Sequence, residues 1–164
     1  MTENNKDWST SLIEKSTELL NQFENNIGLP RNIRPGNPEE LEKYLSMDAN
    51  ILDKLDMKEC ANISYRLVQY SLYMQRCLNA EKSTSKMLIK KIDGIIAPVI
   101  NNYKGAWNMQ RAAAIEDNDA AKTLNSALSE SEARQERLEF VATGFKNLAD
   151  HMRNLQFSKK DNNG

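Results

Sequence analysis

The stretch MKECANISYRLVQYSLYMQRCLNAEKSTSKMLIKKIDGIIAPVINNY, residues 57–103, has the pattern of one very long helix. Asp56 stands just before it and Glu59 follows three residues on, which is the capping-box signature of a helix start. Apolar side chains then recur in steps of four and three, the spacing of a coiled-coil face. An unbroken helix here would be about 70 Å long, which favours an elongated molecule. The apolar positions are Ile63, Leu67, Tyr70, Met74 and Cys77, then Leu88, Ile92, Ile95 and Val99.

A break is expected near the end of this stretch, where Gly94 and Pro98 lie four residues apart. Proline lacks an amide hydrogen and clashes with the carbonyl four residues earlier, so it kinks or ends a helix. The sequence from Asn101 to Gly105 then indicates an exit loop. Residues 106–115 are again rich in helix-forming residues.

Shorter helices are predicted before residue 56. We expect Met1–Lys6 to be disordered and a first helix to run from Asp7 to about Asn25. Gly28–Gly36 contains two prolines and indicates an extended linker, either a mobile tether or a packed corner. Asn37 and Pro38 have the pattern of an N-cap and first turn, which predicts a short helix over Pro38–Leu45. Another helical stretch covers Met47–Leu55.

The last predicted helix begins near Asp117–Asp119 and runs to about Phe157. Its apolar face is interrupted by Ser131 and Gln135, and the long helix has a matching polar interruption at Asn79–Lys86. If the two helices pack antiparallel, these polar segments meet, and buried polar residues of this kind set helix register.

These patterns predict an all-α fold, a long antiparallel helical hairpin of coiled-coil type with shorter N-terminal helices. We divide the chain into an N-terminal helix and linker arm (1–36), an elongated helical domain (37–157) and a disordered tail (158–164).

The apolar surface is too wide for a two-helix hairpin to bury, because Tyr65, Leu72 and Tyr73 extend it beyond one face. We expect other copies of the chain to cover it, so a homo-oligomer is predicted. A monomeric bundle of three or four helices is the alternative. The expected interface residues are Ile63, Leu67, Tyr70, Met74, Leu138, Phe145, Leu148 and Met152.

Nothing in the sequence indicates a membrane protein or an enzyme. We expect no signal peptide, because the first seven residues are polar, and the sequence has no apolar run of membrane-spanning length. Cys60 and Cys77 would lie about 25 Å apart on one helix, so reduced thiols and a cytoplasmic location, in a host cell if phage-encoded, are expected. His151 is the sole histidine, and phosphate-loop, dinucleotide and nucleophile-elbow motifs are absent. We therefore expect no catalytic residue, metal or cofactor.

Charge is unevenly distributed along the chain. Residues 1–56 carry a net charge of −5, residues 57–111 carry +6, and residues 112–164 carry −2. Cations that follow a backbone, beside aromatic rings that offer a stacking surface, are typical of single-stranded nucleic acid binding. Pairing with acidic segments of this chain or of a partner is the alternative. The candidate DNA-binding residues are Lys82, Lys86, Lys90, Lys91, Lys104 and Arg111, with Tyr103 and Trp107 as the aromatics.

The segment LDMKECANISYRLVQYSLYMQRCLNAEKSTSKMLIKKI, with the exit NNYKGAW at 101–107, resembles the UvsY family of phage recombination mediators. The second long helix, IEDNDAAKTLNSALSESEARQERLEFVATGFKNL, also fits, so the resemblance covers about two-thirds of the chain by pattern. It implies ring-like helical oligomers that bind single-stranded DNA and help load a recombinase onto DNA coated by a single-strand-binding protein. The matching basic positions are Lys86, Lys90, Lys91 and Lys104.

Two functions follow as hypotheses. The first is a recombination mediator that binds single-stranded DNA, with the recombinase and the single-strand-binding protein as protein partners. The second is a structural or adaptor helical oligomer of a phage, without a nucleic acid partner.

Overall fold

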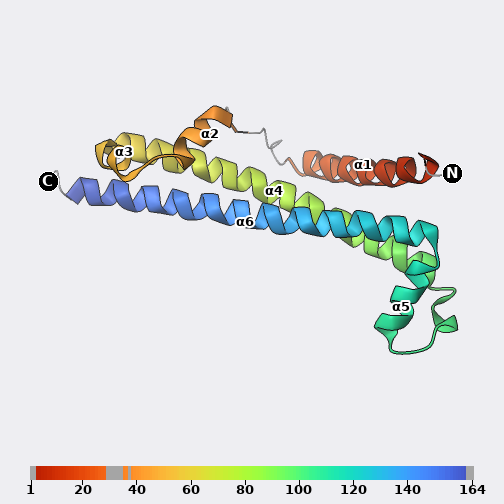
Figure 1. Cartoon of the computed structure of the whole chain (residues 1–164). Helices are drawn as coiled ribbons and strands as arrows, with labels where there is room; N and C mark the ends of the chain where they lie inside the picture. Colours follow the sequence, from red (N-terminus) through yellow and green to blue (C-terminus); the bar gives the residue numbers. More distant parts are fainter. Residues whose placement is uncertain (1–2, 29–34, 37, 162–164) are drawn as a thin grey trace. The chain divides into compact units, whose positions relative to one another are not determined.

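The computed structural model describes residues 3–28, 35–36 and 38–161, and all its regular elements there are helical (Figure 1). The two longest helices, α4 and α6, pack antiparallel, and shorter helices precede them. The all-α hairpin predicted from the sequence is confirmed. In order, the elements are α1 (Glu3–Asn26), α2 (Pro38–Leu45), α3 (Ala49–Lys54), α4 (Met57–Ile96), the 3₁₀ turn η1 (Ile100–Asn102), α5 (Trp107–Glu116) and α6 (Asp119–Asp161).

The start of α4 is fixed by the predicted capping box. The Glu59 N–H donates to Asp56 Oδ1 at 2.7 Å, and the Asp56 N–H donates to Glu59 Oε2 at 2.8 Å. Two amide groups that the first helical turn leaves without partners are thereby satisfied.

The end of α4 follows from Pro98. The helix ends at Ile96, and the Ala97 N–H makes a last bond of helical type to the Asp93 carbonyl at 2.9 Å. A residue before proline is disfavoured in helical conformation, so the helix stops here rather than continuing to Tyr103. Gly94 lies inside the helix, and η1 and a loop with Gly105 at φ +114° lead into α5.

The chain divides into two compact units, and each contains one part of the α4–α6 pair. The first unit comprises residues 1–31 and 78–136, and the second comprises 32–77 and 137–164. The predicted division into arm, domain and tail stays a prediction. The core of the first unit joins α4, α5 and α6 through Leu88, Ile92, Ile96, Ala114, Ile115, Ala121, Leu124 and Leu128.

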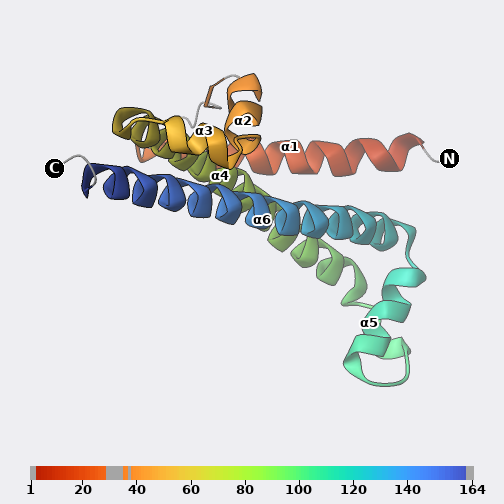
Figure 2. The ribbon, with the colours of Figure 1, turned by 60° about the vertical axis from the view of Figure 1, so that its left-hand side comes forward.

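The second unit has its own core between α4 and α6. The rings of Tyr70 and Phe145 lie 5.8 Å apart, and the Ser64 hydroxyl donates to the Ala149 carbonyl at 2.9 Å. The short helices α2 and α3 lie beside the first half of α4 (Figure 2) and add half-buried side chains to this core. The buried residues are Cys60, Ile63, Leu67, Tyr70, Phe145, Ala149 and Met152.

The helix α2 is tied to this unit by polar contacts as well. Tyr44 donates its hydroxyl hydrogen to Glu40 Oε1, and Arg66 Nε lies 3.8 Å from the same oxygen. Burial, followed by the hydrogen bond to Glu40, raises the pKa of Tyr44 to about 12. Asp48 caps α3 by accepting the Ile51 N–H at 2.9 Å.

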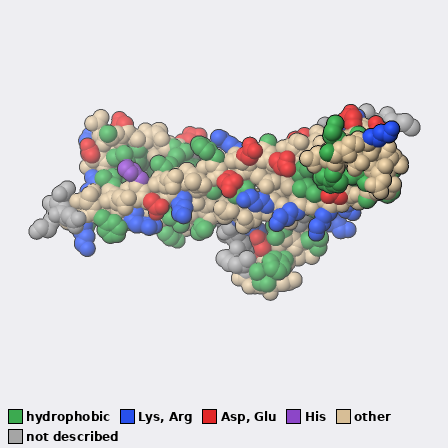
Figure 3. Space-filling view, turned by 90° about the horizontal axis from the view of Figure 1, so that it is seen from below, with side chains coloured by type: hydrophobic (Ala, Val, Ile, Leu, Met, Phe, Trp, Pro, Cys, Tyr) green, Lys and Arg blue, Asp and Glu red, His purple; other side chains and the backbone are tan. Residues whose placement is uncertain are grey.

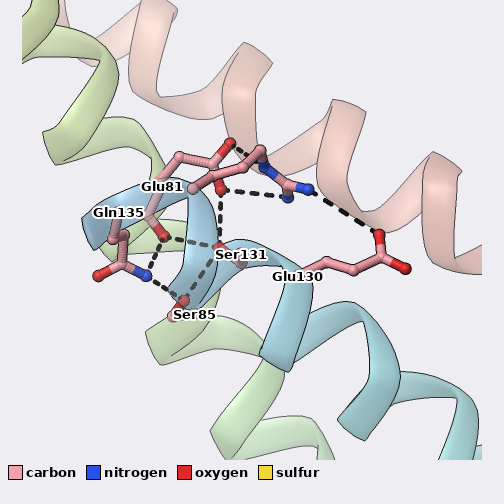
Figure 4. Close-up of polar contacts among 6 residues, drawn as sticks. Glu81, Ser85, Glu130, Ser131 and Gln135 are labelled. Atoms are coloured by element: carbon pink, nitrogen blue, oxygen red, sulfur yellow. Dashed lines mark hydrogen bonds and ion pairs between the residues drawn. The ribbon is translucent and has the colours of Figure 1, made fainter. Parts of the chain in front are cut away.

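A polar cluster interrupts the packing of α4 on α6 in the first unit (Figure 4). Ser131 is fully buried and donates to Glu81 Oε2 at 2.7 Å, while Ser85 donates to Ser131 Oγ at 3.0 Å. Arg134 Nε donates to Glu81 Oε1 at 2.9 Å, and the Gln135 amide donates to Ser85 Oγ. The expectation that the two polar segments meet is therefore confirmed.

Both ends of the described chain are more helical than expected. The helix α1 begins at Glu3, so Glu3–Lys6 are not disordered, and no proline or glycine there opposes helix formation. The helix α6 continues to Asp161, past the expected end at Phe157. Lys159 donates to the Asp53 carbonyl at 2.7 Å, and basic residues are favourable in a last helical turn. The expected N-cap Asn37 and linker residues 29–34 lie outside the described residues.

Replacing Asp56 with alanine removes one half of the capping box. We expect the free energy of unfolding to fall by about 1 kcal/mol, because an amide of the first turn of α4 loses its partner. Urea denaturation followed by circular dichroism measures this change. Lys58→Ala is the matched control, since Lys58 is exposed in the same turn. Equal stability of the two variants would contradict a role of the cap.

Replacing Ser131 with alanine removes one donor to the Glu81 carboxylate and removes the acceptor of the buried Ser85 hydroxyl. We expect the free energy of unfolding to fall by about 1–3 kcal/mol, the cost of an unsatisfied buried polar group. Ser129→Ala is the control, because the exposed Ser129 donates only to the Asn125 carbonyl of its own helix. A Ser131→Ala protein as stable as the control would show that the polar cluster does not stabilise the hairpin.

Candidate nucleic-acid interface

Three of the predicted DNA-binding lysines lie together on α4. Lys86, Lys90 and Lys91 are exposed and line one open groove on a single face of the helix. None of the three makes an ion pair or hydrogen bond with another described side chain, so their charges face solvent. We call this surface the lysine groove; its remaining lining residues are Ser83, Met87, Gly94 and Ile95.

The space-filling view shows Lys and Arg side chains interspersed with hydrophobic and acidic ones (Figure 3). Lys82 precedes the lysine groove, but it is half-buried and already takes part in an interaction. Lys104 is exposed in the loop between η1 and α5 and does not line the groove. The predicted lysines are therefore only partly brought together.

Tyr103 is not available as a free stacking ring. It packs against the core of the first unit, and its hydroxyl donates to Asp117 Oδ2 at 2.9 Å. Its backbone carbonyl accepts the side-chain amide of Gln110 at 2.8 Å. The hydrogen bond to the Asp117 carboxylate is the main cause that raises the pKa of Tyr103 above its ordinary value of 10.0. These contacts indicate a residue that holds the loop before α5.

The other predicted aromatic, Trp107, lies in a second concave surface. This surface is an open hollow of about 630 Å³ between α4, α5 and α6. Trp107 is 60% exposed, and the Arg111 guanidinium lies 6.0 Å from the centre of its ring. We call this surface the tryptophan hollow; it is lined by Ile89, Asp93, Trp107, Asn108, Arg111, Ala112, Ile115, Glu116, Asn125, Leu128 and Glu132.

Arg111 is committed to contacts inside the tryptophan hollow. Its Nε donates to Asp93 Oδ1 at 3.1 Å, so its charge is shared between a carboxylate and the Trp107 ring. Glu116 in the same hollow is paired with Lys122 at 2.6 Å, and this hydrogen bond raises the pKa of Lys122. Two of the acidic side chains are thus already compensated by basic partners.

Several residues of the hollow were not foreseen from the sequence. Ile89, Asn125 and Glu132 carry no motif, and they come together only because three helices pack around one space. Asp93 had one available signal, since a lone acid within a run of lysines on one helix suggests a specific partner. That partner, Arg111, lies eighteen residues away, beyond the reach of helical spacing.

Most residues assigned to an oligomer interface are buried within the chain itself. Ile63, Leu67, Tyr70, Phe145 and Met152 belong to the core of the second unit. Met74 and Leu138 are half-buried, and Leu148 is 40% exposed. The interface between copies stays a prediction. The large apolar side chains that do face solvent in this unit include Tyr65, Leu72 and Phe140.

The described residues carry little that suggests other chemistry. Within them, no group of three or more His, Cys, Asp or Glu side chains could hold a metal ion. No helix among them is long and apolar enough to cross a lipid bilayer. His151 is exposed on α6, and Cys60 is buried, which raises the pKa of its thiol.

Comparison with protein-family models, with curated proteins and with solved structures found no match for this chain.

Asp117→Asn tests the contact that holds Tyr103. We expect the pKa of Tyr103 to fall toward its ordinary value of 10.0, because the negative charge that opposes ionisation is gone. A raised pKa in the folded state means that this contact stabilises the fold below pH of about 10 and that its effect is lost as pH rises through the folded-state pKa. Phenolate absorbance of each protein minus that of its Tyr103→Phe counterpart isolates the titration.

The control for this titration is Asp119→Asn, which removes an exposed acid of the same turn that does not bond Tyr103. We expect that variant to leave the pKa of Tyr103 raised. An equal fall in both variants would show that general surface charge, rather than the hydrogen bond, raises the pKa.

Proposed function

We propose that this chain binds single-stranded DNA along the lysine groove of α4 and acts as a phage-type recombination mediator. The observation that carries the proposal is the common face of Lys86, Lys90 and Lys91, exposed and without ion pairs to other described side chains. Lysines already paired with carboxylates would have to break those pairs before they could bind a phosphate. Lys86, Lys90 and Lys91 have no such pairs with described side chains, so binding a phosphate does not require breaking one.

The geometry also suits a flexible backbone rather than a compact ligand. Lys86 and Lys90 lie about 6 Å apart along the helix axis, so their ammonium groups follow a line. The groove is open and lies on one helix, with Met87 and Ile95 offering apolar surface between the charges. Lysines in a row attract any polyanion, and the apolar surface favours one with accessible bases.

The recombination role rests on the resemblance of the central helix and its exit to UvsY-type mediators. A recombinase and a single-strand-binding protein are the protein partners that this role requires. The proposal further includes a homo-oligomer, which the exposed Tyr65, Leu72 and Phe140 favour because large apolar side chains in solvent are costly.

A structural or adaptor role is the second candidate. The observation that favours it is an apolar stripe formed by Leu19 and Phe23 of α1 and by Ile27 just after the helix, each more than half exposed and four residues apart. Such a stripe is suited to bind another helix. Under this hypothesis the lysine groove binds an acidic protein surface, and DNA is not a ligand.

The triple variant Lys86→Glu, Lys90→Glu, Lys91→Glu separates the two functions. Fluorescence anisotropy with a labelled oligo-dT at several salt concentrations measures DNA affinity. For the unaltered protein we expect affinity to fall steeply with salt, and the variant should bind more weakly, with a log–log salt slope shallower by about 2, because three phosphate contacts are lost at about 0.7 each.

The control is Lys58→Glu, Lys146→Glu, Lys160→Glu, the same charge change at exposed lysines outside the groove. Light scattering gives the mass of each protein in parallel. Lost DNA binding with unchanged assembly supports the mediator. Absence of binding to oligo-dT by the unaltered protein at low salt contradicts the DNA proposal, and lost assembly of the variant in that case supports the adaptor.

A further inference from the structure

We infer that the tryptophan hollow takes one unstacked base of the bound single strand, with the base lying on the ring of Trp107. The inference rests on the proposed function and adds a second contact to it. The lysine groove binds the backbone, and the hollow binds a base. The ligand class is therefore a single-stranded nucleic acid with an accessible base, not a polyanion in general.

The first support is the state of Trp107. A tryptophan with 60% of its surface exposed, in a concave surface, offers a large apolar face to a flat ligand. It is the first residue of α5, and Arg111 stands one helical turn further on. The Arg111 guanidinium lies 6.0 Å from the ring centre and is bonded to Asp93 of α4, so the indole has a neighbour that is itself fixed.

The second support is the chemistry of the other lining residues. Ile89, Ile115 and Leu128 supply apolar surface from three helices. Asn108 and Asn125 carry amides that both donate and accept hydrogen bonds, which suits the edge of any base. Neither amide is hydrogen-bonded to another side chain in the described parts of the chain. Apolar walls with a few polar groups are the usual composition of a small-ligand site.

Electrostatics allow a phosphate backbone to pass close by. Asp93 is neutralised by Arg111 at 3.1 Å and Glu116 by Lys122 at 2.6 Å. Glu132 remains without an ion pair to a described residue, and its carboxylate accepts hydrogen bonds from an exocyclic amino group. The hollow therefore keeps one uncompensated negative charge, at Glu132, whereas the neighbouring lysine groove is positive.

The lysine groove and the tryptophan hollow share a border on α4. Lys86 precedes Ile89 by three residues, and Lys90 precedes Asp93 by three, so each pair is adjacent on the helix surface. A DNA single strand whose phosphates lie along these lysines therefore passes next to the tryptophan hollow. A base must leave its stack to enter, which is easy in a single strand and costly in a duplex.

Tryptophan fluorescence tests the contact directly, because the chain has only two tryptophans. Trp8→Phe leaves Trp107 as the single reporter. We expect its emission to be quenched by oligo-dT and to remain unchanged with an abasic oligonucleotide of the same length at saturation, since only the former carries bases. Quenching by both, or by neither, overturns the inference.

Affinity gives an independent readout. Trp107→Ala should weaken oligo-dT binding by about 5- to 150-fold, the loss typical of one base–aromatic stack. Affinity for the abasic oligonucleotide should not change. Trp107→Phe should restore part of the loss. Met109→Ala is the matched control, since Met109 is 66% exposed on the same helix but does not line the hollow.

The failure of this inference differs from the failure of the proposed function. If both oligonucleotides bind, and Trp107→Ala weakens them equally or not at all, the lysine groove binds DNA without a base in the hollow. If the unaltered protein binds neither oligonucleotide, both the proposed function and the proposed base site are contradicted. Circular dichroism of each variant verifies that the fold is intact.

Discussion

The hydrogen bonds around Glu81 determine which turn of α6 lies opposite which turn of α4 in the first unit. Most of the packing there is between Leu, Ile and Ala side chains, which resemble one another from turn to turn and tolerate a shift. A shift of α6 along α4 would disrupt the contacts of Ser131, because this side chain is fully buried and would lose its hydrogen bond to Glu81. Arg134 and Gln135 add bonds to the same residues and restrict the register further.

The candidate site depends on this register. Ile89 and Asp93 on α4 share the tryptophan hollow with Asn125, Leu128 and Glu132 on α6. A shift by one turn would place other α6 residues beside Asp93 and change the lining. The end of α4 at Ile96, imposed by Pro98, is equally necessary, because it lets the chain turn and bring α5 with Trp107 and Arg111 back toward α4.

The second unit differs from the first in what its core residues could have contacted. Its core is made by residues that a coiled-coil pattern equally suits to an interface between chains, and here the chain's own α6, with α2 and α3, covers them. Serine hydroxyls that donate to carbonyls of α6, from Ser64 and Ser71, hold the helices closely together. The proposed homo-oligomer would therefore use the apolar side chains that remain outside this core.

The elements of this protein could be predicted from local sequence, because their causes are local. The capping box of Asp56 and Glu59, the stop at Pro98 and the apolar spacing of α4 each depend on residues within one or two turns. The meeting of the polar segments was also predictable, since the interruptions at Asn79–Lys86 and at Ser131 and Gln135 coincide when the two long helices pack antiparallel. The common face of Lys86 and Lys90 follows from helical spacing alone.

Only the tertiary structure decided which apolar residues are buried within one chain and which remain exposed. Periodicity gives each residue a face but does not say whether that face meets α6, α2 or a second copy. The same limit applies to Tyr103 and Trp107, two aromatics in one basic segment. Packing placed Tyr103 against the core with Asp117 and left Trp107 exposed in a hollow, because partners distant in sequence are chosen by the fold.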